Sequence, residues 1–188
     1  MADEMDGVDL SELHQTITDK LKAQFPKFKL IEFYRSEQDR KPPAIHQLPA
    51  LLLELSEFEL DIDNDWGAEQ LPLIARFEAR VVDTFEKPQA KINIRTLATQ
   101  LAYFIFKNKR FHQYAGAKAV GPACVDEITR DYFYPHLESF EVWRVDFSMQ
   151  IGIGENIWKE IGQIPTPVYS YTPDVGVGHE QDYKDLDL

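Results

Sequence analysis

Residues 143–153 read WRVDFSMQIGI, a run in which apolar and polar side chains alternate almost without a break. Because successive side chains of a β-strand point to opposite faces of the sheet, this pattern predicts a strand with one buried face. The run is long compared with an average strand of about five or six residues. We therefore expect a long strand whose end can extend past the sheet edge toward another subunit.

Two upstream segments predict neighbouring strands. Residues 49–60 begin with the near-continuous apolar run PALLLEL, which predicts a strand covered on both faces. Residues 73–81 alternate more cleanly and predict a half-buried strand, with Phe77 on the buried face and Arg76 and Arg80 on the other. The residues between them, Asp61 to Pro72, predict a projecting hairpin loop, since they are too many for a tight turn. Shorter strands are expected at residues 28–34 and 123–128.

Apolar residues at spacings of three and four predict two helices. The first runs from Leu10 to Gln24, with Asp9 or Ser11 as its N-terminal cap. The second, residues 94–106, ends close to basic side chains that suit the negative end of a helix, and we expect it to pack across the sheet. This order of elements predicts an α+β fold with two main helices.

Composition narrows the class of protein. The chain has 188 residues, of which 44% are apolar and 12% aromatic, which favours a single packed core. Its net charge of -12 opposes binding to nucleic acid, so we expect no sequence-specific nucleic-acid binding.

No segment has the length and apolarity of a membrane span, and the acidic start is unlike a signal peptide, so the expected site of synthesis and folding is the cytoplasm. Cys124, the only cysteine, is expected to be a small buried side chain.

The C-terminal part differs in composition from the rest. Prolines, paired glycines and acidic residues follow residue 164, together with Val168, Tyr169, Tyr171 and Val175. Such a segment is unsuited to a core element but too apolar for a passive tail. We expect a single α+β domain over residues 1–164 and an extended C-terminal arm over residues 165–188.

Catalytic and metal-binding motifs are weak. Asp61, Asp63 and Asp65 lie at alternate positions, as in a calcium loop, but Gly67 comes one place late and Pro72 stands where the closing carboxylate is required. An acidic hairpin loop carrying Trp66 is the favoured interpretation. His179 has no second histidine at helical spacing, and no serine lies in a nucleophile elbow. We expect no enzyme activity, cofactor or metal site.

Four segments are similar to the tail terminator family of long-tailed phages and related contractile particles. They are LPALLLEL at residues 48–55, IARFEARVV at residues 74–82, the helix at residues 94–106, and residues 142–158. The C-terminal residues from Tyr171 to Gly176, followed by His179 and Tyr183, also resemble the ends of such proteins. Together these segments span most of the chain.

The resemblance implies a small antiparallel or mixed sheet with helices packed on it, assembled as a hexameric ring on the last ring of the tail tube. The implied partners are further copies of the chain, the tail tube protein, the sheath protein if the tail is contractile, and head–tail joining proteins. The protein would belong to the virion tail, assembled in the host cytoplasm. The residues expected to make these contacts are Glu57, Glu59, Trp66, Val168, Tyr169, Tyr171, Asp174 and Tyr183.

Other functions stay open. A different tail-completion, connector or sheath-contacting subunit would share the ring symmetry and the exposed arm. The host particle can be a phage or a headless tail-like particle. An alternative of another class is a small metal-dependent enzyme that uses Asp61, Asp63, Asp65 or His179.

Overall fold

The fold is seen in a computed structural model of the chain, which divides into two compact units, residues 1–157 and 158–188. Within the first unit it describes residues 8–34, 43–65, 67, 69–86, 88–109, 120–131 and 140–154. Within the second it describes residues 168–169, 177–179, 181 and 184–185. The predicted boundary at residue 164 lies outside these ranges.

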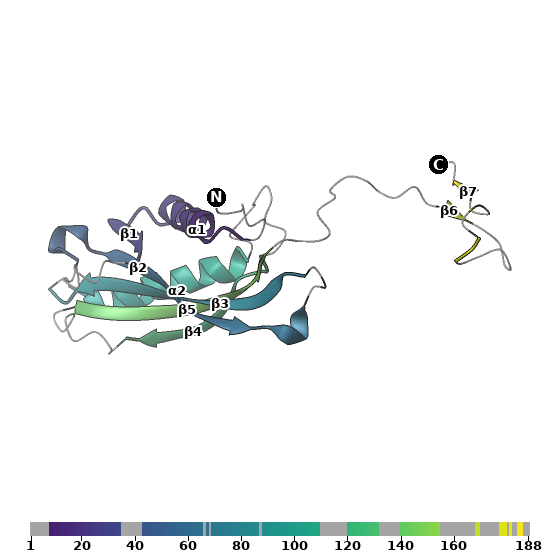
Figure 1. Cartoon of the computed structure of the whole chain (residues 1–188). Helices are drawn as coiled ribbons and strands as arrows, with labels where there is room; N and C mark the ends of the chain where they lie inside the picture. The colour runs from purple at the N-terminus through teal and green to yellow at the C-terminus, as the bar shows by residue number, and fades with distance from the viewer. Residues whose placement is uncertain are drawn as a thin grey trace, which may run out of the picture. The chain divides into compact units, whose positions relative to one another are not determined.

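The first unit is built on a five-stranded sheet in the order β1-β2-β3-β5-β4 (Figure 1). The strands are β1 (Leu30–Phe33), β2 (Ala50–Leu60), β3 (Leu71–Thr84), β4 (Cys124–Arg130) and β5 (Phe140–Ile153). β1 pairs with β2 in parallel, whereas all other neighbours are antiparallel. Two short 3-10 helices, η2 (Ile45–Gln47) and η3 (Ile62–Asn64), precede and follow β2. The predicted α+β class with a mixed sheet is confirmed.

Helix α1 (Leu10–Gln24) has the bounds that its sequence predicts. The side chain of Asp9 caps its first turn by accepting hydrogen bonds from the backbone N–H groups of Ser11 and Glu12, at 2.8 and 3.3 Å. Leu13, Ile17 and Leu21 are fully buried against the sheet. The apolar spacing therefore predicts both the position of this helix and its buried face correctly.

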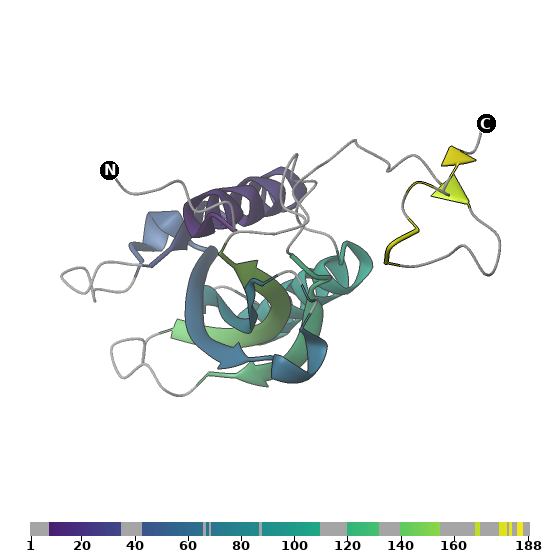
Figure 2. The same cartoon turned by 45° about the vertical axis from the view of Figure 1, so that its right-hand side comes forward.

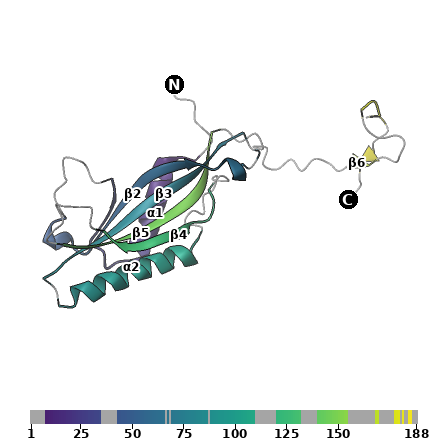
Figure 3. The same ribbon diagram turned by 90° about the horizontal axis from the view of Figure 1, so that it is seen from below.

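Helix α2 (Ala90–Lys107) begins four residues before the predicted start at residue 94. The difference arises because Lys91, Ile92 and Asn93 lie outside the buried apolar pattern of the helix, and the first turn is held instead by hydrogen bonds from the N–H groups of Ile92 and Asn93 to the carbonyl of Gln89. The residues of α2 that point into the core are Ala90, Ile94, Leu97, Ala98, Leu101, Ala102 and Ile105. Figure 3 shows α2 lying along one face of the sheet, as expected.

Both helices contribute to one core on the same face of the sheet. On the central strands the rings of Phe77 and Phe147 stack with centroids 5.0 Å apart and planes 10° from parallel. Phe25, just after α1, meets Phe104 of α2 edge to face at 5.5 Å, which joins the two helices. The strands curl strongly, as Figure 2 shows when the sheet is viewed from the side.

Both faces of β3 are buried at its C-terminal end, which the alternating pattern does not predict. There Val82 joins Leu48, Ala50 and Val142 in a second, small cluster on the face opposite the helices. Ala50 and Leu51 are accordingly both buried, so the expected cover on both faces of β2 is confirmed for the start of that strand. The half-buried interpretation of β3 holds for its middle and is wrong for its end.

Cys124 is exposed, contrary to the expectation of a buried side chain. It opens the edge strand β4, where it pairs with Ser148 and lies on the face of the sheet that the helices do not cover. Burial of cysteine is a tendency of the residue type and is overridden here by its place at an edge. Among the described residues, no helix is both long and apolar enough to cross a lipid bilayer.

Candidate interaction surfaces

The hairpin that joins β2 to β3 extends past the end of α2 in Figures 1 and 3. Phe58 pairs with Ala75 and Leu60 with Leu73, so both side chains lie on the face of the sheet that the helices cover elsewhere. Here they are exposed, as are Ile62 and Leu71. Large apolar residues exposed close together in one hairpin favour a surface that binds another protein. We call these four residues the hairpin surface.

The loop of the hairpin is held in place by Asp61. Its Oδ2 accepts a hydrogen bond of 2.6 Å from Nε2 of Gln150 on β5, and its Oδ1 accepts one of 2.8 Å from Nδ2 of Asn64. Its backbone N–H donates to the carbonyl of Pro72 at 3.1 Å. Asp61 is accordingly only 8% exposed, while its neighbour Ile62 is 71% exposed. The loop therefore presents Ile62 outward from a fixed base.

Asp61, Asp63 and Asp65, the residues of the calcium-like pattern, have separate roles. Asp65 accepts a hydrogen bond of 2.9 Å from the N–H of Gly67, and Asp63 is exposed in η3. Among the described residues, no group of three or more His, Cys, Asp or Glu side chains is arranged to hold a metal ion. His179 lies in the second unit and is half-buried.

Glu57 and Glu59 lie on the outer face of the sheet, opposite the helices. Glu59 forms an ion pair with Arg76 at 2.5 Å, and Glu57 is paired in register with Arg76. A bulge between Leu55 and Glu57 places Glu54 on this same face. The strand face that carries the predicted contact residues Glu57 and Glu59 therefore also carries arginine and is not purely acidic.

Arg80 is the centre of the charges on the outer face. Its guanidinium contacts Asp131 at 2.8 Å, Glu54 at 2.9 Å and Glu78. The side chains of Arg80 and Asp131 are 9% and 2% exposed, so this ion pair lies out of solvent. Nearby, burial raises the pKa of Asp146, a shift that its hydrogen bond with Arg144 opposes. This part of the outer face is a fixed network and not a loose acidic surface.

The outer face of α2 carries a second apolar surface that the sequence analysis did not single out. Ile92, Tyr103 and Phe106 are exposed, and they recur with Thr96 and Thr99 at spacings of four and three. This spacing places them on one stripe of the helix, opposite the buried Leu101 and Ile105. We call Ile92, Tyr103 and Phe106 the α2 stripe. The same spacing of four and three can be found in the sequence, but the apolar periodicity of the buried face of α2 is stronger.

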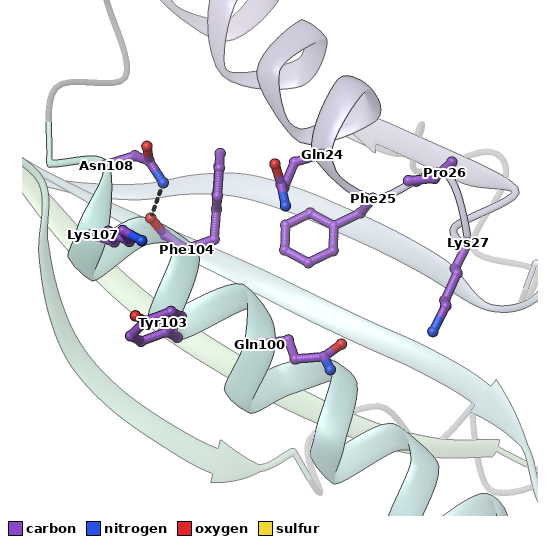
Figure 4. A pocket seen from close by; sticks show the side chains of 9 residues that line it. All are labelled: Gln24, Phe25, Pro26, Lys27, Gln100, Tyr103, Phe104, Lys107 and Asn108. Atoms are coloured by element: carbon purple, nitrogen blue, oxygen red, sulfur yellow. Dashed lines mark hydrogen bonds between the residues drawn. The ribbon is translucent and has the colours of Figure 1, made fainter.

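A groove adjoins this stripe where the end of α1 approaches the C-terminal half of α2 (Figure 4). It encloses about 640 Å³ and is lined by Gln24, Phe25, Pro26, Lys27, Gln100, Tyr103, Phe104, Lys107 and Asn108. Lys107 lies 6.0 Å from the ring centroid of Tyr103, and Lys109 lies 5.3 Å from that of Phe106. The stripe thus combines aromatic rings with basic side chains.

For the other predicted contact residues, the structure describes either the backbone alone or nothing. Trp66, Tyr171, Asp174 and Tyr183 lie outside the described residues. Val168 and Tyr169 form strand β6, which pairs antiparallel with β7 (Lys184–Asp185) in the second unit. Only the backbone of these two residues is described.

Comparison with known proteins gives no family assignment. The chain matches no protein-family model. No curated protein gives a significant match to it.

Proposed function

We propose that this chain is a structural subunit of a virus-like tail, in which a hexameric ring of copies caps the tail tube. The ring would end growth of the tube, and of the sheath where the tail is contractile, and would offer a surface to head–tail joining proteins. The subunit would be assembled in the host cytoplasm, become part of the virion tail, and act through shape without catalysis.

The observation that carries this proposal is the hairpin surface. Phe58, Leu60, Ile62 and Leu71 are exposed on a rigidly anchored projection. Exposing apolar side chains is unfavourable in an isolated chain, and each buried side chain of this size gains about 1.5–3 kcal/mol. A subunit that buries them against another protein recovers this free energy. Such a surface suits an assembly protein better than a chain that works alone.

Ring closure gives a physical mechanism for stopping growth. In a cyclic ring each subunit presents two different, complementary faces, and every contact is satisfied when the ring closes. The exposed end of the ring then differs from the end of the tube, so the next layer of tube protein finds no template. Termination in this proposal is a mismatch between surfaces.

Electron microscopy of particles made without the protein tests the proposal. Overlong tubes of variable length are the expected result. Tubes of normal length without heads would assign the chain to head joining instead, and normal complete particles would reject a role in tail assembly.

A further inference from the structure

We propose that copies of this chain join head to tail, with the hairpin surface of one copy docked on the α2 stripe of the next. This interface rests on the proposed role as a ring subunit and identifies the two faces that such a subunit needs. It commits to a second copy of the chain as the occupant of both surfaces.

The two surfaces are complementary in charge. The hairpin loop carries three exposed acidic residues, Asp63, Asp65 and Glu69, and no Lys or Arg occurs from Glu57 to Glu69. From Pro88 to Lys109 the chain has no Asp or Glu and three exposed basic residues, Lys91, Lys107 and Lys109, while Arg95 pairs with Glu141. In a chain of net charge -12, a helix free of acidic residues stands out as the partner of an acidic loop.

The two surfaces also match in apolar character. Ile62 at the hairpin tip is 71% exposed, and Tyr103 and Phe106 of the α2 stripe are 62% and 59% exposed. The groove beside Tyr103 gives a projecting side chain such as Ile62 a recess on the partner. An apolar centre with charged groups around it is the usual anatomy of a protein interface.

One copy cannot satisfy both surfaces by itself. Leu101 and Ile105 of α2 pack against the sheet, so the stripe on the opposite side of the helix points away from that sheet. The hairpin is part of the same sheet and is held to β5 by the bond between Asp61 and Gln150. The contact must therefore form between copies, and because the two faces differ, it is heterologous and can close into a ring.

A charge exchange between the two surfaces tests the interface. In one full-length variant Lys107→Glu and Lys109→Glu make the α2 stripe acidic, and in the other Asp63→Lys and Asp65→Lys make the hairpin basic. Each variant alone then meets like charge across the contact. An equal mixture restores opposite charges at every contact between the two variants, because the acidic stripe of one meets the basic hairpin of the other, and the basic stripe meets the acidic hairpin.

Sedimentation velocity over a concentration series up to about 1 mM measures the result. Wild-type protein is expected to self-associate, each variant alone to do so at least about tenfold more weakly, and the mixture to return within about threefold of wild type. A control variant with Lys22→Glu and Ile45→Ser changes an exposed charge and an exposed apolar residue elsewhere and should behave as wild type. Thermal melts monitored by circular dichroism establish that every variant is folded.

Three results would overturn the interface. They are a wild-type protein that stays monomeric throughout, variants that associate as wild type, and weakened variants whose mixture is not restored. None of them decides the proposed role in tube termination, which is judged separately by tube length in particles lacking the protein.

Discussion

Asp61 and Gln150 join the loop of the β2–β3 hairpin to the central strand β5 through a hydrogen bond of 2.6 Å, although they are far apart in sequence. Asp61 was singled out in the sequence as the first residue of a calcium-like pattern. Its position in the fold gives it a different role, since both carboxylate oxygens accept hydrogen bonds from side chains of the chain itself. Presentation of the hairpin surface depends on this anchor.

Replacing Asp61 with alanine should therefore loosen the hairpin. The loss of two hydrogen bonds to a buried carboxylate is expected to lower the free energy of unfolding by about 1–3 kcal/mol, measured by urea denaturation. Asp63→Ala changes an exposed carboxylate in the same turn and should cost less than about 0.5 kcal/mol. Equal effects of the two substitutions would show that Asp61 is not an anchor.

Phe147→Ala should destabilise the core more than any surface change. The ring is fully buried and stacks on Phe77, so its removal leaves a cavity between the helices and the sheet. The expected loss of unfolding free energy is about 3–5 kcal/mol. Phe58→Ala removes the same ring from an exposed position on β2 and serves as the matched control, with a loss below about 1 kcal/mol. A loss below about 1 kcal/mol for Phe147→Ala would contradict the described packing.

Arg80 should be coupled energetically to Asp131. Arg80→Met removes one partner of a buried ion pair and is expected to cost about 3–5 kcal/mol. The double variant with Asp131→Asn should cost less than the sum of the single variants, which a double-mutant cycle measures. Arg76→Met, which breaks the solvent-accessible pair with Glu59, should have a smaller effect. Additive effects of Arg80→Met and Asp131→Asn would refute a direct coupling.

His14 should make the fold less stable in mild acid. Burial of its ring lowers its pKa below the usual 6.5, an effect that its contact with the carbonyl of Leu10 partly offsets. Its Nε2 lies 3.1 Å from the hydroxyl of Tyr34, which suits a neutral ring that accepts this hydrogen bond. The unfolded chain binds the proton more readily than the folded chain. The free energy of unfolding therefore has its full value above about pH 6.5 and falls as the pH drops toward the lower pKa of His14 in the folded state.

The measurement is the difference in Tm between pH 7.5 and pH 5.5. This difference should be smaller in His14→Gln than in wild type, because glutamine removes the titrating group. His46→Gln, at an exposed position in η2, should retain the wild-type difference. An unchanged pH dependence in His14→Gln would show that His14 is not the responsible group.

Removal of residues 165–188 tests the predicted role of the C-terminal arm. The first unit has its own core, so a chain ending at Ile164 should keep its circular dichroism spectrum and lose little stability. We expect this shortened chain to self-associate more weakly than the full chain, as measured by sedimentation velocity. Unchanged association would reject a role of the arm in assembly.

Local periodicity explains how much of the fold was predictable. The spacing of Leu13, Ile17 and Leu21 specified α1, and the alternation around Phe147 specified β5, because each pattern records a buried face directly. The early start of α2 and the double burial around Val82 were missed, since they depend on backbone hydrogen bonds and on neighbours distant in sequence. Cys124 was misplaced for the same reason, as sequence alone does not reveal which strand is an edge.

The candidate surfaces were less predictable than the fold. The projecting hairpin was expected from the length of the loop, but the exposure of Phe58 and Leu60 follows only from how far the helices extend along the sheet. Likewise, the pairing of Glu59 with Arg76 depends on the register between β2 and β3, which the bulge after Leu55 shifts. Because an interface depends on how several elements are placed together, the sequence of any one element predicts it less well than it predicts a helix or a strand.

The most direct test of the central claim is a titration of purified protein into extracts in which tail tubes grow without it, with tube length measured by electron microscopy. A capping subunit acts stoichiometrically, so tubes should reach a uniform length only when about one ring of copies is supplied per tube end, with a ring visible at that end. Restoration by far fewer copies than tube ends, or no change in length at any ratio, would contradict the account.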